Sequence, residues 1–172
     1  TQLALIHYDL VPLVFADHYL KSQRYAHFYR ESLKSFDHFD CIASISAFSK
    51  EDLDTRFPHL KDRSVAIGTG VNPERFHVAS ESASDDALRS DTMPAHYILC
   101  APSGFDYRKN VPGLLKVYAK LPATLRVNYP LYLVGRVGDR DRRGLEALVQ
   151  DLGLTDQVIL TGFVEDQELI RF

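Results

Sequence analysis

The sequence is poor in the residues that mark several classes of protein. It has no tryptophan, one methionine and two cysteines among 172 residues. Cys41 and Cys100 lie in apolar runs, which favours free thiols in a reducing cytosol over a disulfide. No apolar run reaches the length of a membrane span, and we expect no signal peptide. The net charge of -3 argues against a nucleic-acid partner, which requires a basic surface.

Several catalytic and metal-binding motifs are missing as well. The chain has neither the GxxxxGK[ST] of nucleotidases nor the GxSxG of hydrolases. Gly68-Thr69-Gly70 lacks the third glycine of a dinucleotide fingerprint. The segment 37–40 (DHFD) holds three ligand-type side chains, but it lies at an expected helix end, where a histidine complements the helix dipole. We therefore predict no metal site.

What the chain does contain is a regular alternation of strands and helices. We expect strands at residues 3–7, 41–46, 64–67, 97–101, 132–135 and 158–161. Helices are expected at 17–39, 109–120 and 141–152, and a further helix is expected to begin at Asp166. Another helix is expected to follow Ser46, with Ser49 as its N-cap. The absence of hairpin signals and the apolar strands favour parallel sheets covered on both faces. The predicted class is therefore α/β with two Rossmann-like parallel-sheet units.

The organisation along the chain favours two incomplete units. Residues 77–95 are polar and rich in serine and aspartate, which indicates a linker between units 1–76 and 96–172; a plain loop within one domain is the alternative. The chain begins inside an expected strand and ends early in an expected helix, so we expect both units to be parts of larger domains.

One segment has two interpretations. Residues 17–39 carry aromatic and aliphatic side chains at helical spacing, which predicts one buried helix face. The alternative is a helix at a membrane interface. The residues that support the buried face are Tyr25, Phe28, Tyr29, Leu33 and Phe36, and those that support the membrane helix are Lys21, Arg24, Arg30 and Lys34.

The candidate ligand site lies where the strands end, because ligands of open α/β sheets bind at the carboxyl ends of strands. Arg108 and Lys109 stand where a helix is expected to open, and helix N-termini with cations suit phosphates. Arg136 follows the next strand and is the best further cation, whereas Arg140, Arg142 and Arg143 fit a solvated helix face. His7 and Asp9 lie at the end of the first expected strand. They could transfer protons in a cleft, or they could be ordinary loop residues that make local hydrogen bonds.

Taken together, six segments resemble the family 4 (group 1) glycosyltransferases of the GT-B fold. They are IHYDLVPL, DCIASISAFSKEDL, VAIGTGVNPERF, YILCAPSGFDYRKNVPGLLKVYAKLP, YPLYLVGR and GLTDQVILTGFVEDQEL, in family order along nearly the whole chain. The chain is most similar to the bacterial mannosyltransferases that build surface polysaccharides.

The resemblance implies a retaining, metal-independent enzyme without a cofactor, which moves a sugar from a nucleotide-sugar donor to a glycan or a lipid-linked acceptor. It implies a cytoplasmic protein and allows peripheral association with the inner face of the membrane. By position it implies that Arg108 and Lys109 are catalytic and also bind the donor, and it places His7 and Asp9 on the acceptor side of the cleft. The other donor-binding residues that it implies are Gly104, Gly135, Arg136, Phe163 and Val164.

The chain also departs from the family pattern. The usual His-Asp-Leu is represented by Tyr8-Asp9-Leu10, with His7 one place earlier, and the usual Asn-Gly-Val turn is Thr69-Gly70-Val71. The family's pair of glutamates would lie beyond Phe172. We therefore expect no transfer by this piece alone and expect it to self-associate. A nucleotide-sugar epimerase and a non-catalytic α/β binding domain are the alternatives.

Overall fold

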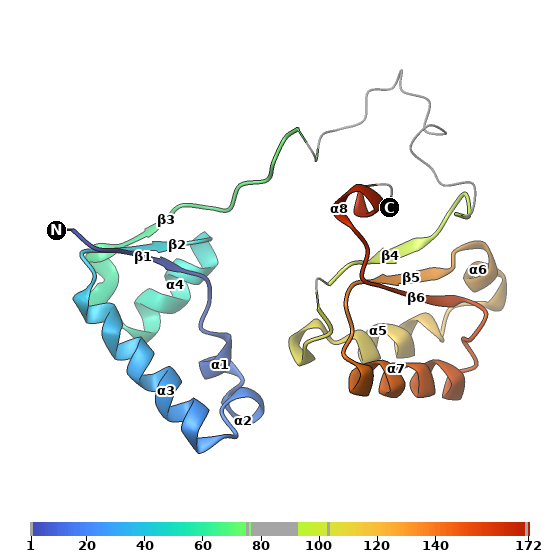
Figure 1. The fold of residues 1–172 in the computed structure, drawn as a ribbon, viewed down its shortest axis with the longest axis horizontal. Coiled ribbons are helices and arrows are strands. Elements are labelled where there is room, and N and C mark those ends of the chain that lie inside the picture. The colour runs from blue at the N-terminus through green and yellow to red at the C-terminus, as the bar shows by residue number, and fades with distance from the viewer. Residues whose placement is uncertain (1, 75, 77–92, 103, 171) are drawn as a thin grey trace. The chain divides into compact units, whose positions relative to one another are not determined.

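The computed structural model describes residues 2–74, 76, 93–102, 104–170 and 172. It divides the chain into two compact units, Thr1–Asn72 and Pro73–Phe172 (Figure 1). Most of the predicted linker, 77–95, lies outside the described residues, so the linker stays a prediction. Each unit is an α/β layer built on its own parallel sheet of three strands, which confirms the predicted fold class.

The first sheet consists of β1 (Ala4–His7), β2 (Cys41–Ser44) and β3 (Ser64–Ala66), in the order β1-β2-β3. All pairs are parallel, and His7 stands beside Ser44 in the register. The helices between these strands lie on one side of the sheet (Figure 1). They cover a core of Leu10, Leu33, Ile42, Leu53 and Leu60.

The predicted helix at 17–39 is wrong as a single element. The chain forms α1 (Val11–Val14), α2 (Ala16–Tyr19), α3 (Gln23–Lys34) and a 3-10 turn, η1 (Ser35–His38). The break falls before Ser22, whose hydroxyl accepts the Tyr25 N–H at 3.4 Å and so caps α3. The predicted stripe is buried only in part, because Tyr29, Leu33 and Phe36 pack into the core while 65% of Phe28 is exposed.

Ser46, and not Ser49, caps the next helix, α4 (Ala47–Arg56). Ser46 has an extended backbone, and its hydroxyl accepts the Ser49 N–H at 3.0 Å, as an N-cap requires. Ser49 is already helical and buried, and its hydroxyl donates to the Tyr8 carbonyl at 2.8 Å. The second serine therefore ties the start of α4 to the end of β1.

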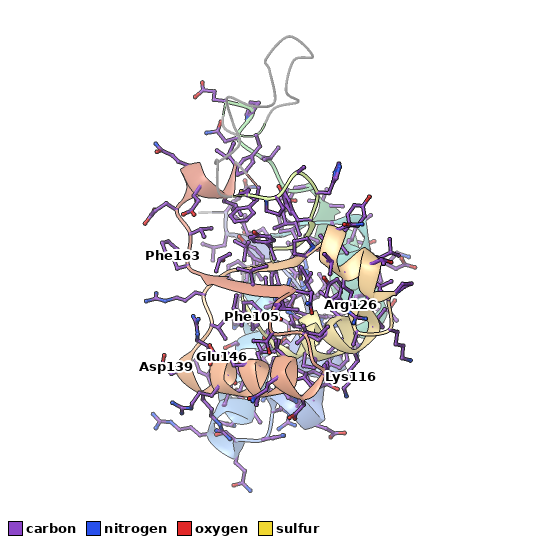
Figure 2. All side chains as sticks on the ribbon, turned by 90° about the vertical axis from the view of Figure 1, so that its right-hand side faces the viewer. Phe105, Lys116, Arg126, Asp139, Glu146 and Phe163 are labelled. Atoms are coloured by element: carbon purple, nitrogen blue, oxygen red, sulfur yellow. The ribbon has the colours of Figure 1, made fainter. Side chains whose placement is uncertain are left out.

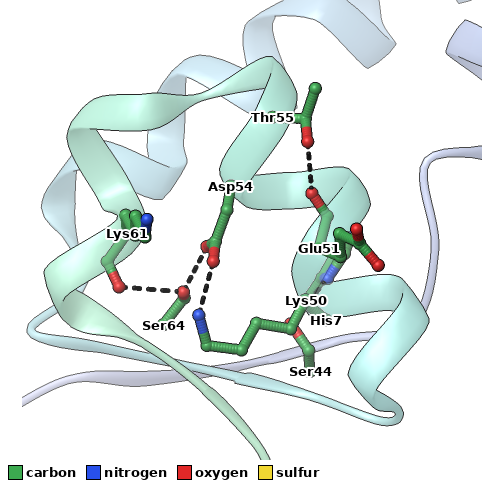
Figure 3. A network of polar contacts seen from close by, with 8 residues as sticks. All are labelled: His7, Ser44, Lys50, Glu51, Asp54, Thr55, Lys61 and Ser64. Atoms are coloured by element: carbon green, nitrogen blue, oxygen red, sulfur yellow. Dashed lines mark hydrogen bonds and ion pairs between the residues drawn. The ribbon is translucent and has the colours of Figure 1, made fainter.

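A polar network holds α4 against the end of the 3-10 helix η2 (Pro58–Arg63) and the start of β3 (Figure 3). The Lys50 ammonium and the Ser64 hydroxyl both donate to the Asp54 carboxylate. Burial raises the pKa of Asp54, but these two hydrogen bonds and the positive charges of Lys50 and Lys61 together outweigh burial and leave that pKa lowered. The ionised carboxylate thus joins helix and strand.

The second sheet consists of β4 (Ile98–Cys100), β5 (Leu131–Val134) and β6 (Val158–Gly162), all parallel, in the order β4-β5-β6. The predicted strands are confirmed to within two residues. The connecting elements are η4 (Tyr107–Lys109), α5 (Val111–Tyr118), α6 (Ala123–Asn128), α7 (Asp139–Asp151) and α8 (Asp166–Leu169). Figure 1 shows α5 and α7 on one face of this sheet and α8 on the other.

Helix α6 is an element that the sequence analysis missed. The Arg126 guanidinium on α6 donates to the carbonyls of Ala119 and Leu121, just past the end of α5. The Tyr118 hydroxyl lies 2.9 Å from the Tyr129 carbonyl, directly after α6. Burial raises the pKa of Tyr118, so the phenol remains a donor at neutral pH. These contacts pair the free carbonyls at two helix ends.

Candidate functional site

The carboxyl ends of β4, β5 and β6 surround a cavity of about 400 Å³ in the second unit. This is the position at which open α/β sheets bind ligands. The residues that line the cavity are Ala101, Val134, Gly135, Arg136, Phe163, Val164, Asp166 and Leu169. Four of the residues named from the sequence, Gly135, Arg136, Phe163 and Val164, thus lie together around one space.

Gly135 brings a second loop to this site. Its φ of +145° is one that residues with a side chain rarely adopt. A Cβ at this position would lie 3.5 Å from Phe105 Cε2 and 4.0 Å from the Gly104 nitrogen. The loop of Gly104 therefore lies against the end of β5, beside the cavity. Phe105 anchors that loop by packing on the hydrophobic core (Figure 2).

Phe163 and Arg136 give the cavity its chemical character. Phe163 follows β6 (Figure 2), and 65% of its surface is exposed. An exposed aromatic face beside a cavity is suited to stacking on a flat ring. Arg136 follows β5 and adds a permanent positive charge with planar donors, which suit phosphate oxygens. The site can therefore hold a ligand with an aromatic and an anionic part.

Arg108 and Lys109 do not stand at the N-terminus of α5, so the prediction that a helix begins with these two cations is wrong. They form the 3-10 turn η4, and α5 begins at Val111, after Asn110 in the left-handed conformation (φ 47°). Asn110 tolerates that conformation, and Pro112 is compatible only with the first turn of the helix. Both cations are exposed, and neither lines the cavity.

Lys109 nevertheless lies near the end of β4. Burial raises the pKa of the Cys100 thiol in β4, and the positive charge of Lys109 acts in the opposite direction. Cys100 immediately precedes Ala101, which lines the cavity. Lys109 is therefore close enough to the end of β4 to act on Cys100, one residue before the cavity lining begins. Arg142 pairs with Glu146 at 2.8 Å on α7, but a Cβ at Gly162 would lie 3.8 Å from Arg142 Nη1, so this guanidinium also reaches the end of β6.

In the first unit, His7 ends β1 and is only 3% exposed. Its Nδ1 lies 3.1 Å from the Ser44 hydroxyl oxygen, and its ring packs edge-on against Phe36 with centroids 6.0 Å apart. Burial lowers the pKa of His7, and the carboxylates of Asp9 and Asp52 oppose this shift. The imidazole is therefore neutral at pH 7.

The two carboxylates that act on His7, those of Asp9 and Asp52, also act on a second group, Tyr29. Asp9 is exposed, and its carboxylate accepts the Val11 N–H at 3.1 Å, a local loop contact at the start of α1. Burial, and to a lesser extent the carboxylates of Asp9 and Asp52, raise the pKa of Tyr29 to about 12. Asp52 pairs with Arg56 at 2.8 Å. Nothing in the sequence marks Tyr29 or Asp52 as a functional residue, because each looks like an ordinary helix residue.

The described part of the chain holds no cluster of three or more metal-ligand side chains, so metal independence stays a prediction. Cys41 and Cys100 are free thiols. None of the described helices has both the length and the hydropathy needed to cross a bilayer.

Comparison with known proteins identifies the second unit. The family described as "Glycosyl transferases group 1" matches residues 92–172. Residues 92–172 belong to this family. The matched glycosyl transferase segment contains β4, β5 and β6 together with the whole lining of the cavity. The resemblance inferred from the sequence is thereby confirmed.

The relatives extend the match to the rest of the chain. The serotype-specific mannosyltransferase WbdA of Escherichia coli is 31% identical over 166 residues, which is 95% of this chain and 20% of WbdA. The chain thus spans about a fifth of the length of this curated relative.

Two solved structures share the fold. WaaG, a glycosyltransferase involved in lipopolysaccharide biosynthesis, has a TM-score of 0.70 at 20% identity, over 95% of this chain and 47% of WaaG. Anabaena HepE, solved in complex with UDP and glucose, has a TM-score of 0.65 at 17% identity, over 98% of this chain and 44% of HepE. The chain therefore covers part of the GT-B fold.

Proposed function

We propose that the protein to which this chain contributes is a retaining glycosyltransferase that moves a sugar from a nucleotide-sugar donor to a glycan or a lipid-linked acceptor. The observation that carries the proposal is the cavity at the ends of β4, β5 and β6, where Phe163 and Arg136 lie together. HepE, which shares this fold, was solved with UDP and glucose, molecules of the chemical class proposed here. The relative WbdA, a mannosyltransferase, favours mannose as the sugar.

The donor would bind with its base at Phe163 and Val164 and its diphosphate towards Gly104, Gly135 and Arg136. Because Gly135 has no Cβ, the loop of Gly104 can lie close to the end of β5, which would bring its backbone to the diphosphate. Breaking the sugar–phosphate bond places negative charge on the diphosphate. Fixed cations stabilise that charge without a metal ion, and we assign Arg108 and Lys109 to this role.

The first unit would serve the acceptor. His7 and Asp9 lie at the carboxyl end of β1, the edge at which α/β sheets bind ligands. The neutral imidazole of His7 suits a hydrogen bond to a hydroxyl better than the neutralisation of an anion.

We further propose that the protein is cytoplasmic and associates peripherally with a membrane. Support comes from α3, where Tyr25 and Phe28 are exposed and Arg24 is exposed beside them. Aromatic and basic side chains on one helix favour an interface with anionic lipids.

This chain alone is expected to be inactive and to self-associate. Ile6 and Val65 are 62% and 45% exposed on the face of the first sheet opposite His7 and Ser44. Parallel sheets are normally covered on both faces, so an open apolar face favours association.

Titration of a nucleoside diphosphate into the chain, followed by calorimetry, tests the donor site. Lys109→Ala should weaken binding by about 1.5–3 kcal/mol through the loss of one charge-assisted contact. Lys116→Ala is the matched control, because Lys116 is an exposed lysine on α5 (Figure 2). Equal affinity in the wild type and Lys109→Ala would remove Lys109 from the site.

A further inference from the structure

His7 and Ser44 form a buried polar pair on the covered face of the first sheet. They are register partners in the parallel pair of β1 and β2, and their side chains are 3% and 0% exposed. His7 Nδ1 lies 3.1 Å from Ser44 Oγ, a hydrogen-bond distance. Phe36 packs against the ring at an interplanar angle of 72°. The imidazole is therefore held on two sides.

The second ring nitrogen, His7 Nε2, is buried and has no partner within hydrogen-bond distance among the described residues, while the Asp9 backbone lies close enough to the ring to raise the pKa of His7. A neutral imidazole carries its proton on only one nitrogen, so the hydrogen bond at Nδ1 decides what Nε2 carries. The pair has two arrangements. Either Ser44 donates to Nδ1 and Nε2 bears the proton, or Nδ1 donates to Ser44 and Nε2 is a bare lone pair.

Counting unpaired groups separates the two arrangements. If Nδ1 donated, the Ser44 hydroxyl would need another acceptor, and the described residues offer its side chain only His7. Both a buried hydroxyl proton and the Nε2 lone pair would then lack partners. If Ser44 donates, its proton is paired, and the Nε2 proton is the one unpaired donor. Each unpaired buried polar group is costly, and donation by Ser44 leaves one such group where donation by Nδ1 leaves two, so the arrangement in which Ser44 donates is favoured.

We propose that Ser44 is a positioning residue that donates its hydroxyl proton to His7 Nδ1 and thereby holds His7 as the Nε2–H tautomer. His7 then carries a hydrogen-bond donor, and not a base, at the buried Nε2. The use of this donor on the acceptor side rests on the proposed function. The tautomer itself does not.

Long-range proton–nitrogen NMR of the full chain, labelled with 15N-histidine, tests the assignment. The His7 signals are identified through their loss in His7→Gln. In the wild type, Nδ1 should show the shift of an unprotonated nitrogen and Nε2 that of a protonated one. Ser44→Ala should lower the ratio of the two tautomers by about five-fold, the effect of one ordinary hydrogen bond. Ser44→Thr retains the hydroxyl and should keep the wild-type pattern.

Ser49→Ala is the matched control, because that buried serine donates to the Tyr8 carbonyl and not to His7. A protonated Nδ1 in the wild type, or a tautomer ratio that Ser44→Ala leaves unchanged, would overturn the proposal. The wild-type spectrum alone shows which His7 nitrogen carries the proton, even if Ser44→Ala fails to fold. If Ser44→Ala changes the tautomer while sugar transfer by the whole protein is unaffected, the acceptor role of His7 fails and the tautomer assignment stands.

Discussion

Replacing Gly135 by alanine should destabilise the second unit, whereas the same change at Gly144 should stabilise it. Gly135 has φ +145°, a conformation that costs an alanine roughly 1–3 kcal/mol. The new Cβ would lie 3.5 Å from Phe105, an ordinary contact, so the cost comes from the backbone and not from a clash. The lower entropy of the unfolded alanine variant offsets about 0.4–1 kcal/mol of this cost, so the midpoints of the two ranges give a net loss of roughly 1.3 kcal/mol.

Gly144 lies inside α7, and a Cβ there meets nothing within 4 Å. Alanine should therefore raise the free energy of unfolding by about 0.5–1 kcal/mol, the difference in helix propensity. Hydrogen exchange of the β5 amides reports the stability of this unit alone. Protection should fall in Gly135→Ala and rise in Gly144→Ala. An equal or higher stability of Gly135→Ala would refute the assignment of its backbone conformation.

Two further changes test the first unit and the core. Because burial lowers the pKa of His7 below its ordinary 6.5, the unfolded state binds the proton more readily, and the first unit should lose stability as pH falls below about 6.5. His7→Gln should flatten that slope in urea unfolding at several pH values; an unchanged slope would contradict the assignment. Leu133→Ala, at a fully buried position, should cost about 2–5 kcal/mol, while Val127→Ala, 68% exposed, should cost much less. Equal losses in thermal unfolding would contradict the described core.

The sequence predicted the strands well, because each is a short apolar run that ends at glycine or a polar residue. Prediction from the sequence failed where contacts between individual side chains and the backbone set the start or the position of a helix. Asn110 and Pro112 separate η4 from α5, and this removed Arg108 and Lys109 from the helix start. Helix α6 has no apolar stripe of its own, and its position depends on Tyr118 and Arg126 contacts that no periodicity reveals.

The cavity was predictable in part for the same reason. Gly135, Arg136, Phe163 and Val164 directly follow strands, and parallel pairing brings those strand ends to one edge. Asp166 and Leu169 come from the short helix α8 and complete the lining, but nothing in their spacing marks them as ligand-facing. On the first unit, the burial of His7 follows from its register with Ser44, which only the three-dimensional pairing shows.

The binding of nucleoside diphosphates to Phe163→Ala tests the central claim most directly. Stacking of a base on an aromatic ring contributes about 1–3 kcal/mol. In calorimetric titrations with UDP and GDP, the affinity of Phe163→Ala for whichever nucleotide binds the wild type more tightly should therefore fall roughly ten-fold. Phe48→Ala is the control, because Phe48 is 78% exposed in the first unit, outside the cavity. Wild-type affinity in Phe163→Ala, or the same loss in Phe48→Ala, would contradict a nucleotide site at the ends of β4, β5 and β6.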